Sequence, residues 1–239
     1  FYFLRYTKYQ HSDPSHTTNE LAPWELPTYL LSECATVNQV KQALRNVKVI
    51  SVMLPKLGIV LPLHYIVTDA SGKSIVIEYQ NSKLHIYPNP LGVITNSPPF
   101  PWMLTNLAVM KRLHDIPAGD FSSPSRFIRA AIFKENAPPV ATGLAGVLQV
   151  FHLLNQFDLP RGTIKVVRHS KPYLEYTRWA TVADLKAKRY YFKTYRDQDI
   201  RMVDLTKIDP NEKHIFWIAT TNKQPITNVT NQLQPFLNY

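Results

Sequence analysis

A proline-rich corner in the middle of the chain constrains its folding more than any other feature. Residues 94–102 have the sequence ITNSPPFPW, in which three prolines fall within four residues. An apolar, strand-like run ends at this corner, and a helical pattern opens at Trp102. Proline fixes its own φ and restricts the preceding residue to extended geometry. We therefore expect the Asn96 side chain, at the end of the strand, to be held in one direction.

Asn96 has two interpretations on this local pattern. A rigid carboxamide at the end of a core strand can aim an N–H at the negative charge that develops in a reaction. The alternative is that Asn96 satisfies the backbone of a turn, where asparagine is common. The local pattern taken alone favours the turn.

Strand patterns occupy both ends of the chain, and helical patterns lie between them. We expect strands over residues 1–9, within 47–68, and over 74–79, 83–87, 176–184, 189–196, 200–205 and 215–219. We expect helices over residues 23–32, 102–113, 123–137 and 144–154. Thr36 and Gln39 form a capping-box pattern, which predicts one more short helix. Ser123 is the predicted N-cap of the helix that Pro138 ends.

This order of elements favours an α+β fold. Strands and helices do not alternate as they do in parallel sheets, so a layered domain with largely antiparallel sheet is expected. No internal repeat or long linker divides the sequence. We therefore expect a single domain over residues 1–239, with a polar tail over 220–239 in which Phe236 and Tyr239 are candidate anchors.

The composition allows a substantial core and predicts a basic surface. Hydrophobic residues make up 45% of the chain, yet no apolar run approaches the roughly 20 residues that a membrane-spanning helix needs. The chain has 27 Lys and Arg against 17 Asp and Glu, a formal net charge of +10, which suits an anionic partner or substrate. The single cysteine excludes an intramolecular disulfide.

Common signatures of enzymes are absent. The sequence has no phosphate-binding loop, no GxGxxG and no GxSxG. Its scattered histidines lack the spacing of metal ligands, so we expect core or surface histidines, no metal site and no cofactor. Cys34 follows Glu33, whose charge raises the pKa of the thiol, and a small buried cysteine is favoured over a reactive one.

The segment 161–201 combines positive charge with aromatic residues. It has 11 Lys and Arg against four Asp and Glu. A surface that binds single-stranded nucleic acid is one interpretation, with bases stacking in a basic groove. A half-buried antiparallel strand with a basic outer surface is favoured instead, because Tyr191, Lys193 and Tyr195 share one face of the strand.

Arg178 lies near the start of a predicted strand of small and apolar residues, beside Trp179. If its side chain points inward, it needs an anionic partner. A cation on the surface fits the pattern equally well, and both interpretations stay open.

Several stretches together resemble one enzyme family. Residues 63–72 (LHYIVTDASG), 93–98 (VITNSP) and 177–184 (TRWATVAD) are similar to stretches of the choloylglycine hydrolases, a family that includes bile salt hydrolases and penicillin V acylases. The same holds for residues 124–127 (PSRF), 189–192 (RYYF) and 202–205 (MVDL). Each motif is short, but the ordered set is specific, and the similarity spans roughly residues 1–209.

The resemblance implies an N-terminal nucleophile hydrolase fold, an αββα sandwich of antiparallel sheets between helical layers. It implies hydrolysis of a linear amide that is not a peptide bond: a conjugated bile salt, penicillin V or another N-acyl compound. Asn96 matches a family asparagine that helps hold the oxyanion, and Arg178 matches an arginine beside the nucleophile. A homotetramer in the bacterial cytoplasm or periplasm is also implied. Candidate residues of the acyl pocket are Phe3, Met53, Leu54 and Ile59.

The chain departs from the family pattern at its first residue. The nucleophile of the family is an N-terminal cysteine, and Phe1 cannot replace it. We therefore expect that the chain is the C-terminal portion of an acylase, that the first strands of the sandwich lie outside it, and that it is inactive by itself. A truncated sequence, a cleaved enzyme with a second chain and a non-catalytic relative are the three explanations. The alternative from a different class is a module that binds nucleic acid or anionic lipid through residues 161–201.

Overall fold

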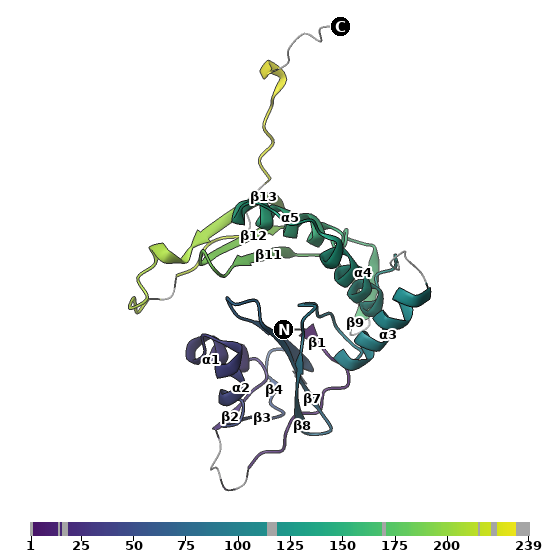
Figure 1. Cartoon of the computed structure of the whole chain (residues 1–239), viewed down its shortest axis with the longest axis vertical. Coiled ribbons are helices and arrows are strands. Elements are labelled where there is room, and N and C mark those ends of the chain that lie inside the picture. The colour runs from purple at the N-terminus through teal and green to yellow at the C-terminus, as the bar shows by residue number, and fades with distance from the viewer. Residues whose placement is uncertain are drawn as a thin grey trace. The chain divides into compact units, whose positions relative to one another are not determined.

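The computed structural model of the protein describes residues 2–13, 15, 19–113, 119–168, 171–214, 216–220 and 224–232. The chain forms two compact units, Phe1–Pro138 and Pro139–Tyr239 (Figure 1). The expected single domain stays a prediction. Phe236 and Tyr239, the candidate anchors of the tail, lie outside the described residues.

The first unit is built on a four-stranded antiparallel sheet with the strand order β1-β6-β7-β8. The strands are β1 (Tyr2–Phe3), β6 (Leu63–Thr68), β7 (Ser74–Gln80) and β8 (Lys83–Pro88). Successive side chains of a strand point to opposite faces, so Ile75 and Ile77 face one side of the sheet and Val76 and Glu78 the other. The predicted meander over residues 63–87 is confirmed.

Helices cover both faces of this sheet. On one face, α1 (Leu26–Glu33) and α2 (Val37–Ala43) pack their apolar residues against Ile75 and Ile77. On the other face, α3 (Phe100–Leu113) and α4 (Ser123–Asn136) pack around Val76. Burial on both faces explains why β7 is an almost continuous apolar run instead of an alternating one.

Two short strand pairs complete the first unit. One is parallel and joins β2 (Asn19–Leu21) to β3 (Val47–Val49). The other is an antiparallel hairpin of β4 (Met53–Leu54) and β5 (Ile59–Val60).

The second unit has a three-stranded antiparallel sheet and one long helix. The sheet contains β11 (Trp179–Asp184), β12 (Arg189–Thr194) and β13 (Asp197–Asp204), and α5 (Gly143–Asn155) lies across it (Figure 1). Val147 and Phe151 of the helix form a small core with Val182 and Tyr191 of the sheet. A hairpin of β9 (Ile164–Arg168) and β10 (Lys171–Glu175) precedes the sheet, and the short helices η1 (Leu205–Lys207) and η2 (Thr230–Gln232) follow it.

The predicted helix starts are confirmed at one cap and shifted by a residue at another. Thr36 and Gln39 make both bonds of the capping box, as the sequence pattern indicated. At α4 the N-cap is Ser122 instead of Ser123, because the Ser122 hydroxyl accepts the N–H of Ser125.

Some predicted strands are wrong. The strand expected over residues 1–9 pairs only at Tyr2–Phe3, because the next free N–H, that of Arg5, is donated to the Ser97 hydroxyl instead of a strand. The apolar run before Asn96 is not a strand either. Its carbonyls at Val93 and Thr95 accept from the side chains of Asn89 and His64, so they need no partner strand.

Two further boundaries differ from the expected strands. Residues 176–178 lie outside β11, and Thr177 exchanges hydrogen bonds with the backbone of Leu159, a loop residue. The described residues 216–219 carry no strand pairing and are exposed to solvent.

A buried tyrosine cluster makes the first unit sensitive to alkaline pH. Burial raises the pKa of Tyr9 from 10.0 to about 12, and it also raises the pKa of Tyr65 and Tyr79. The unfolded chain loses these protons first, so the free energy of unfolding is at its full value below pH ~10 and falls as the pH rises toward 12.

Replacing Tyr9 with Phe tests this cluster. The Tyr9 hydroxyl donates to the Leu61 carbonyl at 2.6 Å and accepts the Leu63 N–H at 2.8 Å. Without the hydroxyl, the Leu61 carbonyl and the Leu63 N–H stay buried but lose this partner. We therefore expect Y9F to lower the free energy of unfolding by about 1–3 kcal/mol at neutral pH. The decline above pH ~10 becomes shallower but persists through Tyr65 and Tyr79. Urea denaturation at a series of pH values measures both effects, and an identical pH curve for Y9F would contradict the assignment.

Candidate active site

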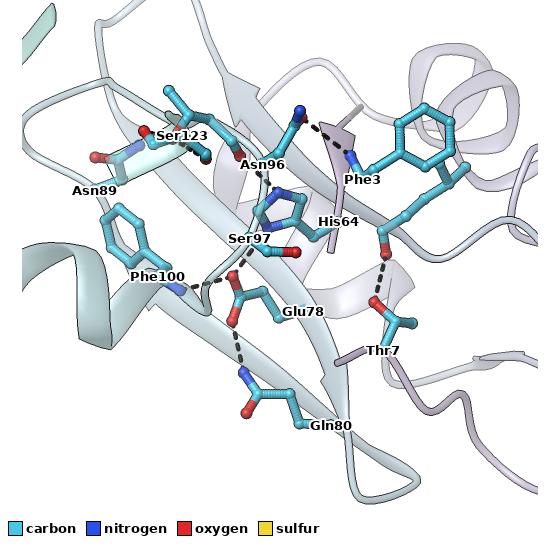
Figure 2. A network of polar contacts seen from close by, with 12 residues as sticks. Phe3, Thr7, His64, Glu78, Gln80, Asn89, Asn96, Ser97, Phe100 and Ser123 are labelled. Atoms are coloured by element: carbon cyan, nitrogen blue, oxygen red, sulfur yellow. Dashed lines mark hydrogen bonds and ion pairs between the residues drawn. The ribbon is translucent and has the colours of Figure 1, made fainter. Parts of the chain in front are cut away.

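Asn96 lies between β8 and α3, in a connection whose inner part is buried. Its Oδ1 atom accepts the backbone N–H of Phe3 at 3.4 Å (Figure 2). The neighbouring Ser97 hydroxyl accepts the N–H of Arg5 at 2.7 Å. The first strand therefore runs beside this connection. Because a backbone N–H needs an acceptor, the contact assigns Oδ1 toward Phe3 and leaves the NH₂ group of Asn96 as the other arm of the carboxamide.

A buried polar network lies beneath this connection. The two ring nitrogens of His64 lie 2.9 Å from Glu78 Oε1 and 2.8 Å from the Thr95 carbonyl oxygen (Figure 2). Glu78 also accepts the N–H of Phe100 at 2.9 Å and the side-chain amide of Gln80 at 2.7 Å. His64 is 1% exposed and Glu78 is 0% exposed. Because isolated buried charges are costly, these partners are what allow both residues to lie in the core.

Sequence reasoning missed the importance of this pair. His64 was expected to be an ordinary core or surface histidine, and Glu78 lies in a strand predicted from its apolar neighbours. The signal that could have found the pair is positional. In the register that pairs Tyr65 with Ile77, His64 and Glu78 are directly opposite each other on one face of the sheet.

The candidate pocket residues of the first unit lie on exposed apolar surface. Phe3 is 50% exposed, and Met53 and Ile59 of the β4–β5 hairpin are 60% and 48% exposed. Leu54, in the same hairpin, is half-buried and packs on the core. Large exposed apolar side chains of this kind suit contact with an apolar group.

Arg178 lies in the second unit and is exposed to solvent. Its guanidinium donates to the Tyr173 hydroxyl at 2.6 Å and lies 5.4 Å from the centre of the Tyr176 ring. The hydrogen bond to Tyr173 raises the pKa of Arg178, so the cation is retained. Arg178 and Arg196 line a cavity of about 620 Å³ whose wall also includes the aromatic residues Tyr176, Trp179, Tyr190, Phe192 and Tyr195. The cavity therefore combines two arginine cations with flat aromatic surface.

One lysine of the basic segment 161–201 does not lie on the predicted outer surface. Lys193 is 7% exposed, and its ammonium lies within hydrogen-bonding distance of Asn155, Asp158 and Gln198. It was expected on the outer face, but these three oxygen acceptors compensate its burial. Arg189 and Arg201 form ion pairs with Asp204 and Asp197.

Two other features bear on the type of site. Among the described residues, His, Cys, Asp and Glu form no group of three that could hold a metal ion. In the same part of the chain, no helix combines the length and apolar character needed to cross a membrane.

Cys34 ends α1 and packs, half-buried, against the core of the first unit. Burial raises the pKa of its thiol, and the charge of Glu33 raises it further. A raised pKa leaves less thiolate at neutral pH, which is the opposite of what a nucleophilic cysteine needs. The structure thus agrees with the prediction of an unreactive cysteine.

The reactivity of Cys34 can be measured directly. We expect the folded chain at pH 7 to react with an aromatic disulfide reagent more slowly than the same chain in urea, because only the thiolate attacks. Replacing Glu33 with Gln removes the negative charge, which is the smaller of the two causes of the raised pKa of Cys34, and should speed the reaction slightly. Labelling of the folded protein faster than of the unfolded chain would show that the thiol is activated.

The sequence is similar to proteins of one hydrolase family along most of its length. Residues 1–118 and 112–216 match the family of linear amide C–N hydrolases, choloylglycine hydrolase family. An uncharacterised protein of Paramecium bursaria Chlorella virus 1 is 36% identical over 219 residues, which cover 84% of this chain and 78% of the viral protein. A bile salt hydrolase/transferase of Lactiplantibacillus plantarum is 31% identical over 237 residues, which cover 89% of this chain and 68% of that protein.

Solved structures of two hydrolases share the fold. A variant of the conjugated bile acid hydrolase from Clostridium perfringens matches with a TM-score of 0.80 and 25% identity, over 96% of this chain and 76% of the hydrolase. Penicillin V acylase from Agrobacterium tumefaciens matches with a TM-score of 0.72 and 24% identity, over 87% of this chain and 62% of the acylase. These likenesses confirm the predicted α+β fold of the N-terminal nucleophile hydrolases. Together with the sequence matches, they show that the chain belongs to the choloylglycine hydrolase family of linear amide C–N hydrolases.

Proposed function

We propose that this protein hydrolyses the amide of an N-acylated small molecule, with Asn96 as a donor to the oxyanion. The orientation of the Asn96 carboxamide carries the proposal. Its Oδ1 is engaged by the N–H of Phe3, so the donor arm of the carboxamide is available to a substrate oxygen. A preorganised N–H aimed at developing negative charge is among the largest single contributions to acyl-transfer catalysis.

The proposed reaction proceeds through an acyl-enzyme. The α-amine of an N-terminal cysteine takes the proton of that residue's thiol, which gives a thiolate and an α-ammonium. The thiolate attacks the carbonyl carbon, and the carbonyl electron pair moves to oxygen, where the Asn96 N–H stabilises the charge. Collapse of this intermediate breaks the C–N bond and releases the amine after proton transfer from the α-ammonium of the nucleophile. Water then attacks the acyl-enzyme, which releases the carboxylic acid and restores the thiol.

The nucleophile in this proposal lies outside residues 1–239. Phe1 has no nucleophilic side chain, and Cys34 is the only thiol in the sequence. The raised pKa of Cys34 and its packing against the core make it unsuitable. We therefore expect these residues to supply the oxyanion donor and part of the substrate pocket, and to require a cysteine from elsewhere for turnover.

The substrate is proposed to join a hydrophobic acyl group to an anionic amine. Phe3, Met53, Leu54 and Ile59 are the candidate contacts of the acyl group, and the exposed apolar surface of the hairpin supports this role. A bile acid, a phenoxyacetyl group and a fatty acyl chain all have this character. The net charge of +10 suits an anionic leaving group such as taurine, glycine or a penicillin nucleus. A homotetramer stays a prediction from the family resemblance.

Arg178 is proposed to favour the thiolate form of the nucleophile. A neighbouring cation lowers the pKa of a thiol because it stabilises the charged form. The bond from Tyr173 and the ring of Tyr176 hold the guanidinium in place at the edge of the aromatic cavity.

Replacing Asn96 with Ala tests the oxyanion role. In protein that carries the nucleophilic cysteine, we expect kcat to fall by about 10²–10³-fold with little change in KM, because the lost bond acts in the transition state. Ser97→Ala is the matched control, since it also removes a side-chain acceptor for a backbone N–H near the N-terminus, that of Arg5, but no oxyanion donor.

Release of the amine from glycine- or taurine-conjugated bile salt and from penicillin V provides the measurement. Residues 1–239 alone should show no turnover of either substrate. Turnover by this chain without any added cysteine would overturn the proposed source of the nucleophile, and normal kcat in N96A would overturn the role of Asn96.

Replacing Arg178 with Gln tests its electrostatic role. We expect the acid limb of the kcat/KM profile to move to higher pH by about 1 unit, because thiolate forms less readily without the cation. Tyr173→Phe is the control, because it removes the hydrogen bond to Arg178 and keeps the positive charge. A uniform loss of kcat/KM at every pH, without a shift of the limb, would assign Arg178 to substrate binding instead.

A further inference from the structure

We propose that His64 and Glu78 are positioning residues that clamp the proline corner at both ends and thereby fix the direction of the Asn96 carboxamide. The inference rests on the proposed function for its meaning in catalysis, but the clamp itself is a property of the first unit. His64 and Glu78 lie on adjacent strands, in the buried face of the sheet beneath α3.

One residue of the pair holds each end of the corner. At the start of the corner, the His64 ring contacts the Thr95 carbonyl at 2.8 Å. At its end, Glu78 accepts the N–H of Phe100, the first residue of α3, at 2.9 Å. The His64–Glu78 contact of 2.9 Å joins these two anchors (Figure 2). Asn96 thus lies in a short segment with both ends tied to one rigid pair.

The partners of His64 show where protons must lie in this clamp. A carbonyl oxygen only accepts, so the Nε2 atom of His64 must carry a proton. The other ring nitrogen faces a carboxyl oxygen, and two lone pairs at 2.9 Å would repel, so a second proton lies between Nδ1 and Oε1. An unbroken chain of hydrogen bonds therefore runs from the Phe100 N–H through Glu78 and His64 to the Thr95 carbonyl.

His64 also controls the other contact of Asn96. Its backbone pairs with Tyr2, and the next residue of β1, Phe3, donates its N–H to Asn96 Oδ1. The Thr95 side chain adds one more anchor, because its hydroxyl donates to the Ser123 carbonyl at 3.0 Å. Holding the Thr95 carbonyl fixes the peptide plane that leads into Asn96, and holding β1 fixes the acceptor contact of its side chain.

The competing explanation is that the pair only stabilises the fold. Two substitutions of His64 distinguish this structural role from the proposed positioning role. In His64→Gln, the amide nitrogen reaches the place of Nε2 and can still donate to Thr95. In His64→Asn, it reaches only the place of Nδ1 and loses Thr95. Each variant removes the ring and one of its two bonds, so a structural role predicts similar losses of stability and no difference at Asn96.

The first measurement needs no catalysis. We expect the carboxamide signals of Asn96 in a ¹H–¹⁵N spectrum of the 239-residue chain to keep their positions in H64Q and to shift and broaden in H64N. Tyr65→Phe is the matched control: it lies on the same strand but faces the opposite side, and it loses a buried hydroxyl that donates to the Pro23 carbonyl. Unchanged Asn96 signals in H64N, or equal shifts in Y65F, would overturn the clamp.

The second measurement uses protein that carries the nucleophile. We expect kcat in H64N to fall by about 10²-fold with KM unchanged, which is the effect of misplacing a reacting group by about 1 Å, and to fall much less in H64Q. If N96A leaves turnover intact, the proposed function fails, while the spectrum still decides the clamp. If N96A abolishes turnover but H64N and H64Q are equally active, the clamp fails and the proposed function stands.

A measurement on the unaltered chain covers the case in which the variants do not fold. The clamp requires an Nε2–H on His64 that is buried and bonded to Thr95, so its ¹H–¹⁵N signal should be visible and slow to exchange with solvent. A neutral ring without a proton at Nε2 would overturn the proposal.

Discussion

A carboxyl group with no exposed surface sets the constraint on which the first unit depends. Glu78 lies in the middle of β7 between apolar neighbours, and its oxygens need N–H partners there. Those partners come from His64 on the neighbouring strand, from the first residue of α3 and from Gln80. Satisfying one acid therefore ties two strands and a helix together. The same two residues fix the path of the proline corner, because His64 contacts the Thr95 carbonyl at its start and Glu78 accepts the Phe100 N–H at its end.

Helices cover both faces of the sheet that carries this buried polar network. Ile75 and Ile77 pack against α1 and α2, while Val76 packs against α3 and α4. A site supported by a sheet buried on both faces holds its geometry better than a site on a free loop. Asn96 itself lies on a connection, yet its neighbours are both held: the Thr95 carbonyl by His64 of β6, and the Ser97 hydroxyl by the N–H of Arg5. This arrangement is what a preorganised oxyanion donor requires.

The second unit shows why a count of charges is a poor guide to a binding surface. The segment 161–201 is strongly basic in sequence, but Lys193 is buried among oxygen acceptors, and Arg189 and Arg201 are paired with acids. Arg178 differs from these cations because it contacts the tyrosines Tyr173 and Tyr176, which do not neutralise its charge. Its place at the edge of an aromatic cavity is consistent with a role toward a thiolate or an anionic ligand.

The sequence by itself determined the local features that depend on neighbouring residues. The capping box at Thr36, the strand meander and the apolar faces of the helices follow from spacing alone, since caps and periodicity act within a few residues. The ordered motifs also determined the family. The proposal of Asn96 as an oxyanion donor also comes from its motif, since its local pattern favoured a turn.

Only the tertiary structure decided which polar groups meet. His64 and Glu78 are 14 residues apart, and Thr95 is 31 residues from His64, so no local pattern connects them. The strand predicted before Asn96 is absent because the side chains of Asn89 and the distant His64 satisfy its carbonyls. The first strand ends early because Ser97 takes the N–H of Arg5. Buried hydrogen bonds are made by whichever groups the fold brings together, and that choice is invisible until the strands have paired.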